Sequence, residues 1–253
     1  MTPSLSAHRG GSPVGFVDRM IRRGSRGIQN IVGMAPKHDE DVKGKSKVVI
    51  IGGGFAGRRC QSLLSSGFDV TLIDAKGYWE YTPAALRNIV EPLHARTCVL
   101  PQPQGTVVGK VVGIEVAASG GGGDGNLVKV SDGSVHPFDY CIISCGSSYT
   151  APVRGDMEAP STPEGRMKEF ERAFKELEAA KSVVVVGGGT SGVEMAAEVA
   201  GKFGKSKDVT LVAGQHTLLD RMHPACGQYA QRWLEARGVK VLLGHRIMDW
   251  GEG

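Results

Sequence analysis

Long apolar runs and paired cysteines are both missing from this 253-residue sequence. No stretch of about 18 apolar residues occurs, so no segment is expected to cross a membrane as a helix. The five cysteines have neither disulfide nor zinc-ribbon spacing, and the seven histidines form no metal-ligand pattern. We therefore propose no metal site. Cys141 and Cys145 lie in an apolar run and are expected to be small buried side chains.

Excess positive charge is also missing from most of the chain. Residues 1–47 hold 9 Lys/Arg and 4 Asp/Glu, whereas the other 206 residues hold 21 and 22. The net charge of +4 therefore belongs to an N-terminal arm. A nucleic-acid-binding domain would carry a basic face on its folded part, so no nucleic-acid partner is expected.

The arm and its linker occupy residues 1–46. Within residues 14–34, helical spacing places apolar side chains on one side and arginines on the other. Three explanations stay open: a helix on a membrane surface, a cleaved presequence, or an unstructured arm. Thr2 excludes the N-myristoylation motif. The expected location is cytoplasmic with membrane association, and the alternative is mitochondrial.

Glycine, in contrast, is abundant, and eight glycines stand in two matching loops. The apolar run 48–51 leads into Gly52-Gly53-Gly54-Phe55-Ala56-Gly57, and the run 183–186 leads into Gly187-Gly188-Gly189-Thr190-Ser191-Gly192, which begins 135 residues later. A single G-x-G-x-x-G match is weak evidence. Two copies, each between a predicted strand and a predicted helix, indicate two dinucleotide-binding units.

Each glycine in such a loop has a physical task. Gly52 and Gly187 make the tight turn out of the strand, and Gly54 and Gly189 let the backbone approach a pyrophosphate. Gly57 and Gly192 allow the helix to pack closely on the strand. The phosphate charge then lies at the N-terminus of the helix, near free N–H groups.

The two units differ at the end of the following strand. Asp74 ends the run 70–74, where its carboxylate can accept hydrogen bonds from an adenosine ribose. Ala213 stands at the matching position of the second unit. Without a carboxylate there, a ribose 2′-phosphate no longer meets a like charge. We therefore expect the second site to accept NADPH at least as well as NADH.

The segments between and after the loops complete an α/β fold. Short strands at 106–108, 111–116 and 126–131 predict a β-meander inserted into a parallel sheet. Residues 163–181 form the clearest predicted helix, with an apolar stripe from Met167 to Leu177 and charges opposite. We expect two Rossmann-like domains, with residues 47–150 forming the first and 151–253 the second.

These motifs resemble those of FAD-dependent pyridine nucleotide oxidoreductases. The resemblance is to the apoptosis-inducing-factor-like group, and especially to NAD(P)H:quinone oxidoreductases of the ferroptosis-suppressor type. The matching blocks are 49–57, 84–87, 111–114 and 183–198, the last being specific. The resemblance implies FAD at the first loop and NAD(P)H at the second. It also implies hydride transfer to flavin, followed by electron transfer to a quinone or similar acceptor.

The resemblance further implies which residues contact the cofactors. Arg87 would meet a flavin phosphate, Val111 would contact the flavin nucleotide, and Glu194 would lie near the nicotinamide. No catalytic residue is nominated, because the flavin supplies the chemistry. The expected cofactor-binding residues are Gly52, Gly53, Gly54, Phe55, Ala56, Gly57, Asp74, Arg87, Val111, Gly187, Gly189, Gly192 and Glu194.

The chain also departs from the family pattern. Ser144-Cys145-Gly146 replaces the usual Ala-Thr-Gly, and the disulfide-reductase pair is missing because the first helix has only Cys60. The returning FAD-domain strand that ends in Gly-Asp, and the acceptor domain after it, are not in the sequence. We therefore expect a C-terminally incomplete enzyme whose isolated chain is poorly soluble or binds FAD weakly. The alternative is a catalytically incompetent FAD/NAD(P)-binding protein with a membrane-associating arm.

Overall fold

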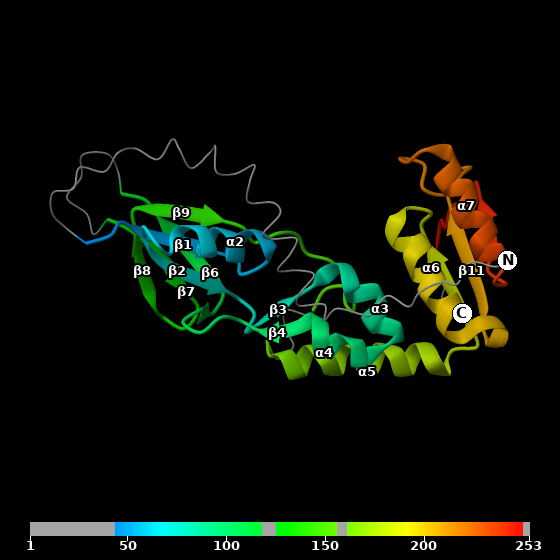
Figure 1. The fold of residues 1–253 in the computed structure, drawn as a ribbon, viewed down its shortest axis with the longest axis horizontal. Coiled ribbons are helices and arrows are strands. Elements are labelled where there is room, and N and C mark those ends of the chain that lie inside the picture. Colours follow the sequence, from blue (N-terminus) through cyan, green and yellow to red (C-terminus); the bar gives the residue numbers. More distant parts are fainter. Residues whose placement is uncertain (1–43, 118–124, 156–160, 250–253) are drawn as a thin grey trace, which may run out of the picture. The chain divides into compact units, whose positions relative to one another are not determined.

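A computed structural model describes residues 44–117, 125–155 and 161–249 of the chain (Figure 1). Lys45–Gly253 forms one compact unit. Residues 1–43 of the predicted arm and linker (1–46) lie outside the described residues, so the role of the arm stays a prediction. Among the helices that are described, none combines the length and apolar character that crossing a membrane requires.

The first sheet is parallel and has the strand order β5-β2-β1-β9. Its strands are β1 (Lys47–Ile51), β2 (Asp69–Asp74), β5 (Val107–Val108) and β9 (Tyr140–Ile143). Strand β1 pairs with β2 on one side and β9 on the other, so that Ile51 lies between Ile73 and Ile143. Because β1 is central, its carboxyl end delivers the first glycine loop to the middle of the sheet edge.

The side chains of β1 alternate between two apolar layers, as the pleat of a strand requires. Val48 and Ile50 pack with Leu72 beneath helix α2 (Phe55–Leu64). Val49 and Ile51 pack on the opposite face against Val128 and Val130 of a second sheet. Figure 1 shows α2 lying along β1. The strand is therefore buried on both faces.

The second sheet is the predicted β-meander, formed by β6 (Val111–Glu115), β7 (Asn126–Val130) and β8 (Val135–Phe138). All its pairings are antiparallel. The expectation that residues 106–108 belong to this meander is wrong. Val107 pairs instead with Ile73 and extends the parallel sheet, held by a hydrogen bond from the Gly109 N–H to the Asp74 carbonyl (2.9 Å).

Between β2 and β5 the chain forms a small subassembly. It contains η1 (Thr82–Ala84) and α3 (Ala85–Val90). An antiparallel strand pair and one further helical stretch were not predicted. These additional elements are β3 (Tyr78–Glu80), η2 (Pro92–His94), α4 (Ala95–Cys98) and β4 (Val99–Pro101).

Helix α5 (Pro163–Ala179) follows the connection and begins with a proline and a side-chain cap. The Thr162 hydroxyl accepts a hydrogen bond from the Gly165 N–H at 3.0 Å, which satisfies one of the free donors at the helix N-terminus. Phe170 is fully buried among Tyr78, Ala85 and Ile89, which confirms that the predicted stripe is core. Two charged residues of α5, Arg166 and Glu169, are buried as well, contrary to the expected separation of charges.

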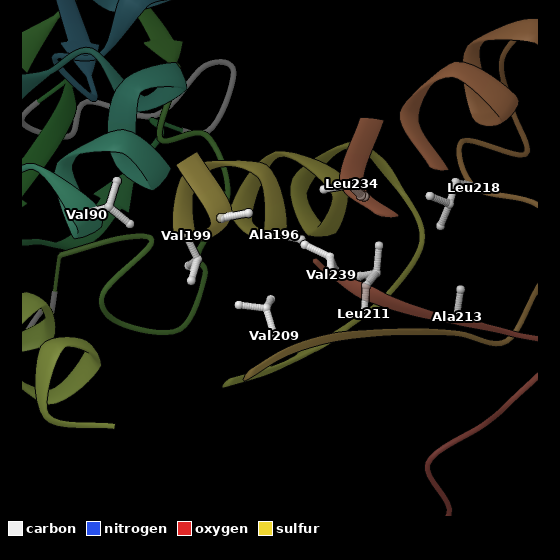
Figure 2. Close-up of a cluster of buried hydrophobic side chains, with 10 residues drawn as sticks. Val90, Ala196, Val199, Val209, Leu211, Ala213, Leu218, Leu234 and Val239 are labelled. Carbon is white, nitrogen blue, oxygen red and sulfur yellow. The ribbon is translucent and has the colours of Figure 1, made fainter. Parts of the chain in front are cut away.

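The second parallel sheet has the order β10-β11-β12, with β10 (Ser182–Val186), β11 (Asp208–Ala213) and β12 (Lys240–Leu243). Helix α6 (Thr190–Phe203), a short turn η3 (Gly204–Ser206) and helix α7 (Pro224–Glu235) complete this part. Figure 2 shows its core, in which Ala196 and Val199 of α6 face Val209 and Leu211 of β11. Val90 of α3 belongs to the same cluster.

Leu63 of α2 is exposed. One detail differs from expectation. Cys145 is exposed, because β9 ends at Ile143 before the cysteine is reached. Val184 and Val186 are also exposed, because they lie on the face of β10 opposite Val183 and Val185, which pack against the core. The proposed domain boundary at residue 150 stays a prediction.

Candidate dinucleotide-binding sites

The first loop has the backbone that the glycine pattern predicts. Gly52 adopts φ +105°, a conformation that side chains other than hydrogen rarely allow. A Cβ on Gly57 would lie 1.8 Å from the carbonyl oxygen of Gly52, so helix and turn are in direct backbone contact. Nothing lies within 4 Å of a Cβ built on Gly54. The loop is therefore tight where it turns and open where a ligand would approach.

Asp74 is the buried acid of this loop. Its carboxylate accepts hydrogen bonds from the Gly53 N–H through Oδ2 and from the Lys76 N–H through Oδ1, the latter at 2.7 Å. The parallel register brings the ends of β1 and β2 together, which explains why residues 21 positions apart meet. The predicted acid therefore lies next to the predicted glycines.

Gln102 packs against Gly53 beside Asp74. Its Nε2 donates to the carbonyl oxygens of Tyr78 (3.1 Å) and Gly53 (3.4 Å). Its Oε1 is buried without a hydrogen-bond partner in the described part of the chain. A buried acceptor without a donor costs free energy, so this atom is suited to a donor supplied by a ligand.

The N-terminus of α2 carries no side-chain cap, and its first turn has no acidic residue. Its first N–H groups therefore remain available to an anion. Phe55 begins the helix and meets Trp79 and Tyr81 edge to face, with ring centroids 5.2 and 5.7 Å away. Arg58 covers the Trp79 ring at 5.2 Å, and burial lowers the pKa of its guanidinium.

The second loop repeats the first in its backbone. Gly187 has φ +117°, a Cβ on Gly192 would lie 1.9 Å from the Gly187 carbonyl oxygen, and Gly189 faces open space. Helix α6 again has no side-chain cap and no acid in its first turn. Both loops therefore offer the same turn and the same free N–H groups.

A cavity of about 410 Å³ opens on the second loop. Leu219 holds one wall, because its N–H donates to the Gly188 carbonyl at 2.8 Å and its φ of +53° is unusual for a branched residue. Such a volume is typical of a small-ligand site. The lining residues are Gly187, Gly188, Gly189, Thr190, Gln215, Leu219, Asp220, Arg221 and Met222.

Ala213 occupies the place that Asp74 holds in the first unit. It ends β11, is 1% exposed, and its Cβ would lie 2.7 Å from a Cβ on Gly188. A methyl group therefore packs where the first unit has a carboxylate accepting from the loop.

The other predicted contacts lie apart from the glycines or on the surface. Arg87 hydrogen-bonds Glu198 of α6 through Nε and Nη2, both at 3.1 Å, and lies 3.9 Å from Glu91. Val111 packs against the apolar layer between the first parallel sheet and the β-meander. Glu194 is exposed on α6. Their roles toward cofactors stay predictions.

A buried ion pair joins Arg166 of α5 to Glu80 of β3, and Arg166 also contacts the connection before α5. The Arg166 guanidinium donates to both oxygens of Glu80 (3.0 Å each), to Glu169 (2.7 Å) and to the carbonyl of Pro152 (2.8 Å). Burial opposes its charge, but the hydrogen bonds to Glu80 raise the pKa of Arg166 above its usual value. Burial also raises the pKa of Tyr78 above its ordinary range. The ion pair fixes the connection that leads to the second unit.

No group of three or more potential metal-ligating side chains occurs in the described ranges. The residues that sequence reasoning missed are Gln102 and Ser144. The Ser144 hydroxyl donates to the carbonyl of Gly52 at 2.9 Å and braces the first turn. Only the position of Ser144 in the Ala-Thr-Gly-like block offered a signal, and none pointed to Gln102.

Fold and loops together define a two-site α/β dinucleotide-binding protein. The sequence profile of the pyridine nucleotide-disulphide oxidoreductase family matches residues 46–250, and the chain belongs to this family. The expected fold class and the resemblance drawn from the sequence are thereby confirmed.

Curated relatives agree with this placement. Ferroptosis suppressor protein 1 of Homo sapiens is 31% identical over 215 residues, covering 83% of this chain and 55% of the relative. Apoptosis-inducing factor homolog A of Dictyostelium discoideum is 30% identical over 212 residues, covering 80% and 50%. The chain thus spans about half the length of the curated relatives it matches.

Solved structures show the same fold. The ferredoxin reductase for the CYP199A2 system from Rhodopseudomonas palustris matches with a TM-score of 0.62 and 17% identity, covering 82% of this chain and 52% of that one. Reduced Bacillus anthracis CoADR-RHD matches with a TM-score of 0.60 and 16% identity, covering 81% and 39%.

Proposed function

We propose that this chain is the nucleotide-binding part of an FAD-dependent oxidoreductase that passes electrons from NAD(P)H to a quinone or similar acceptor. The observation that carries the proposal is the presence of two uncapped glycine loops with one backbone geometry in a member of this family. The resemblance of residues 49–57 and 183–198 to quinone oxidoreductases supports the acceptor class.

The residues of the first loop fit FAD. Gly54 leaves room for a pyrophosphate, and the free N–H groups of α2 complement its charge. Asp74 lies beside Gly53, where it would accept from ribose hydroxyls, and the buried Oε1 of Gln102 would accept one more donor. When bound, the flavin would supply hydride acceptance and electron delivery.

The second loop fits a nicotinamide nucleotide. Gly189 and the N-terminus of α6 would hold its pyrophosphate, and the cavity bounded by Leu219 and Arg221 would enclose the adenosine end. Glu194, one turn along α6, would orient the nicotinamide amide by accepting its N–H. The protein's contribution is to bind and align the two nucleotides, and no acid–base residue is required.

The test is a spectroscopic titration of the purified 253-residue chain with FAD. We expect FAD to bind weakly, as the sequence predicts for this chain, NAD(P)H to bleach its visible absorbance anaerobically, and a soluble quinone to restore it. Asp74→Asn should weaken FAD binding, whereas Asp69→Asn, at the other end of β2, should not. Failure of FAD to bind, or bound FAD that NAD(P)H leaves oxidised, would contradict the proposal.

A nucleotide-binding protein without catalytic competence is the second candidate. The observation in its favour is that both glycine loops have the geometry for nucleotide binding in the described residues, and binding requires nothing beyond them. In that case both nucleotides bind, but the flavin absorbance does not bleach when NAD(P)H is added. The same titration therefore separates the two candidates.

Location is part of the proposal. Residues 14–34 lie outside the described residues, but their sequence pattern of arginines opposite apolar side chains suits the surface of an anionic membrane. We place the protein in the cytoplasm at a membrane surface, with a mitochondrial location as the alternative. Co-sedimentation with anionic liposomes should fall when residues 1–35 are removed, and equal sedimentation would reject the membrane role.

A further inference from the structure

The end of β11 lacks the acid that normally selects against a ribose 2′-phosphate. Ala213 is buried against Gly188, and the following Gly214 has no side chain. In a dinucleotide-binding unit, the adenosine ribose lies next to this strand end. An acid there binds the 2′-hydroxyl, whereas an arginine nearby accommodates a 2′-phosphate. What surrounds Gly214 therefore decides which nucleotide fits.

Arg246 lies directly over Gly214. A Cβ on Gly214 would be 3.2 Å from Arg246 Cγ and 3.5 Å from its Nε. The backbone holds the arginine there, because the His245 N–H donates to the Ala213 carbonyl (3.0 Å) and the Gly244 N–H donates to the Gln215 carbonyl (2.9 Å). The guanidinium is thus delivered to the end of β11 by two hydrogen bonds between the segments that follow β11 and β12.

His216 adds a second nitrogen group at the same edge. Its ring packs on Gly244, where a Cβ would lie 3.0 Å from Cε1 and 3.1 Å from Nδ1. Both His216 and Arg246 are exposed, and neither forms an ion pair within the described residues. An exposed guanidinium without a carboxylate partner is available to bind a phosphate in bidentate geometry.

The local charge balance supports an anionic ligand. Arg221 and Asp220 both line the cavity, so their charges offset each other there. Asp249 follows Arg246 by three residues, but no ion pair joins them. The first loop shows the opposite arrangement, because Asp74 accepts from the Gly53 N–H and its carboxylate would repel a ribose 2′-phosphate.

We propose that the second loop selects the nucleotide that carries a 2′-phosphate, NADPH over NADH, and that Arg246 and His216 determine this selectivity. The inference rests on the proposed function, since it needs a nicotinamide nucleotide at the second loop. The inference goes further in two ways. It predicts that NADPH is preferred to NADH, where the sequence predicted only that NADPH is accepted at least as well, and it assigns this preference to two side chains. Arg246 binds the 2′-phosphate through its guanidinium, and His216 donates a second hydrogen bond.

Isothermal calorimetry on the full chain tests this without relying on turnover. The probes are NADP⁺ and NAD⁺, which differ only in the 2′-phosphate. We expect NADP⁺ to bind at least about tenfold more tightly, the ratio that one charge-assisted hydrogen bond supplies. Raising the salt concentration should reduce the ratio, because an exposed ion pair is screened.

Three variants locate the selectivity. Arg246→Gln should abolish most of the preference by weakening NADP⁺ alone, and His216→Gln should remove a smaller part. Lys240→Gln is the matched control, because Lys240 is an exposed cation at the opposite end of β12 and should leave both affinities unchanged. Since Arg246 is exposed, its replacement is not expected to disturb folding.

The outcomes separate this inference from the proposed function. Equal binding of NADP⁺ and NAD⁺, or an equal loss of both in Arg246→Gln, would overturn the selectivity while leaving the nucleotide site in place. Binding of neither nucleotide would overturn the proposed function together with the selectivity. A preference for NADP⁺ that Arg246→Gln removes and Lys240→Gln retains would establish it.

Discussion

The two βαβ units of this chain share a backbone and differ in their charges. In both units the first glycine, Gly52 or Gly187, has a positive φ. A Cβ on Gly57 or Gly192 would lie less than 2 Å from the carbonyl oxygen of that first glycine. Around that common turn, the first unit places buried Asp74, whereas the second places Ala213 and an exposed arginine. The glycines therefore determine the loop geometry, whereas the residues at the strand ends determine the choice of nucleotide. The two properties are separable.

Buried charge distinguishes the two parts more widely. Four buried charged residues lie in or pack against the part that holds the first loop: Asp74, Glu80, Arg166 and Glu169. In the part that holds the second loop, Lys207 is the buried charged residue among those described. A charge buried in low dielectric needs a partner, so removing one partner costs more than removing an exposed pair. The largest mutational effects are therefore expected near the first unit.

The strongest expected effect is that of Arg166→Met. The variant leaves the buried Glu80 carboxylate without its guanidinium, which should lower the free energy of unfolding by about 4 kcal/mol. Urea denaturation measures the loss. Arg172→Met on the same helix is the control, because its pair with Glu176 is exposed and 4.0 Å long, and it should change stability by less than about 0.5 kcal/mol. Equal effects would show that the buried pair is not a special stabilising contact.

Next in size are Gly57→Ala and Gly192→Ala. Each new Cβ would collide with a backbone oxygen, and we expect each to cost about 3 kcal/mol in urea denaturation. Gly54→Ala and Gly189→Ala are the controls, because nothing lies within 4 Å of either position. A much smaller cost at Gly192 than at Gly57 would break the comparison, and would mean that the edge strand β10 lets the second loop relax.

Lys207→Met should have a moderate effect in the second part. The Lys207 ammonium donates to the carbonyls of Glu178 (2.8 Å) and Ala180 (2.6 Å) at the end of α5. Losing these charged hydrogen bonds at a helix C-terminus should cost about 2 kcal/mol, measured by thermal or urea unfolding. Lys205→Met, an exposed neighbour, serves as the control. A cost as large as that of Arg166→Met would remove the contrast between the two parts.

The smallest expected effect concerns thiol reactivity. Burial raises the pKa of the Cys98 thiol, so less thiolate is present at pH 8 than at an exposed cysteine, about tenfold less per pKa unit. Iodoacetamide should therefore label exposed Cys226 in the folded chain, and Cys98 only as the pH rises further or the chain unfolds. Mass spectrometry of peptides measures the ratio. Equal labelling of both at pH 8 would show that Cys98 is accessible.

The sequence by itself determined the two turns, the parallel strands that lead into them and the missing acid at position 213. These features are local. The positive φ at Gly52 requires glycine, and the close approach of Gly57 to the Gly52 carbonyl leaves no room for a Cβ. The apolar stripe of α5 followed from helical periodicity for the same reason. The family resemblance rested on these local blocks and is confirmed by the profile match.

Only the tertiary structure decided which distant side chains surround each loop. Gln102 reaches Gly53 from 49 residues away, and Arg246 reaches Gly214 through hydrogen bonds between the segments after β11 and β12. Arg166 reads as a surface charge on a helix, yet its guanidinium is buried between Glu80 and the Pro152 carbonyl. Sequence patterns report periodicity and local backbone demands, whereas contacts of this kind depend on how separate elements pack. The nucleotide that each loop prefers therefore depends on packing that only the folded chain reveals.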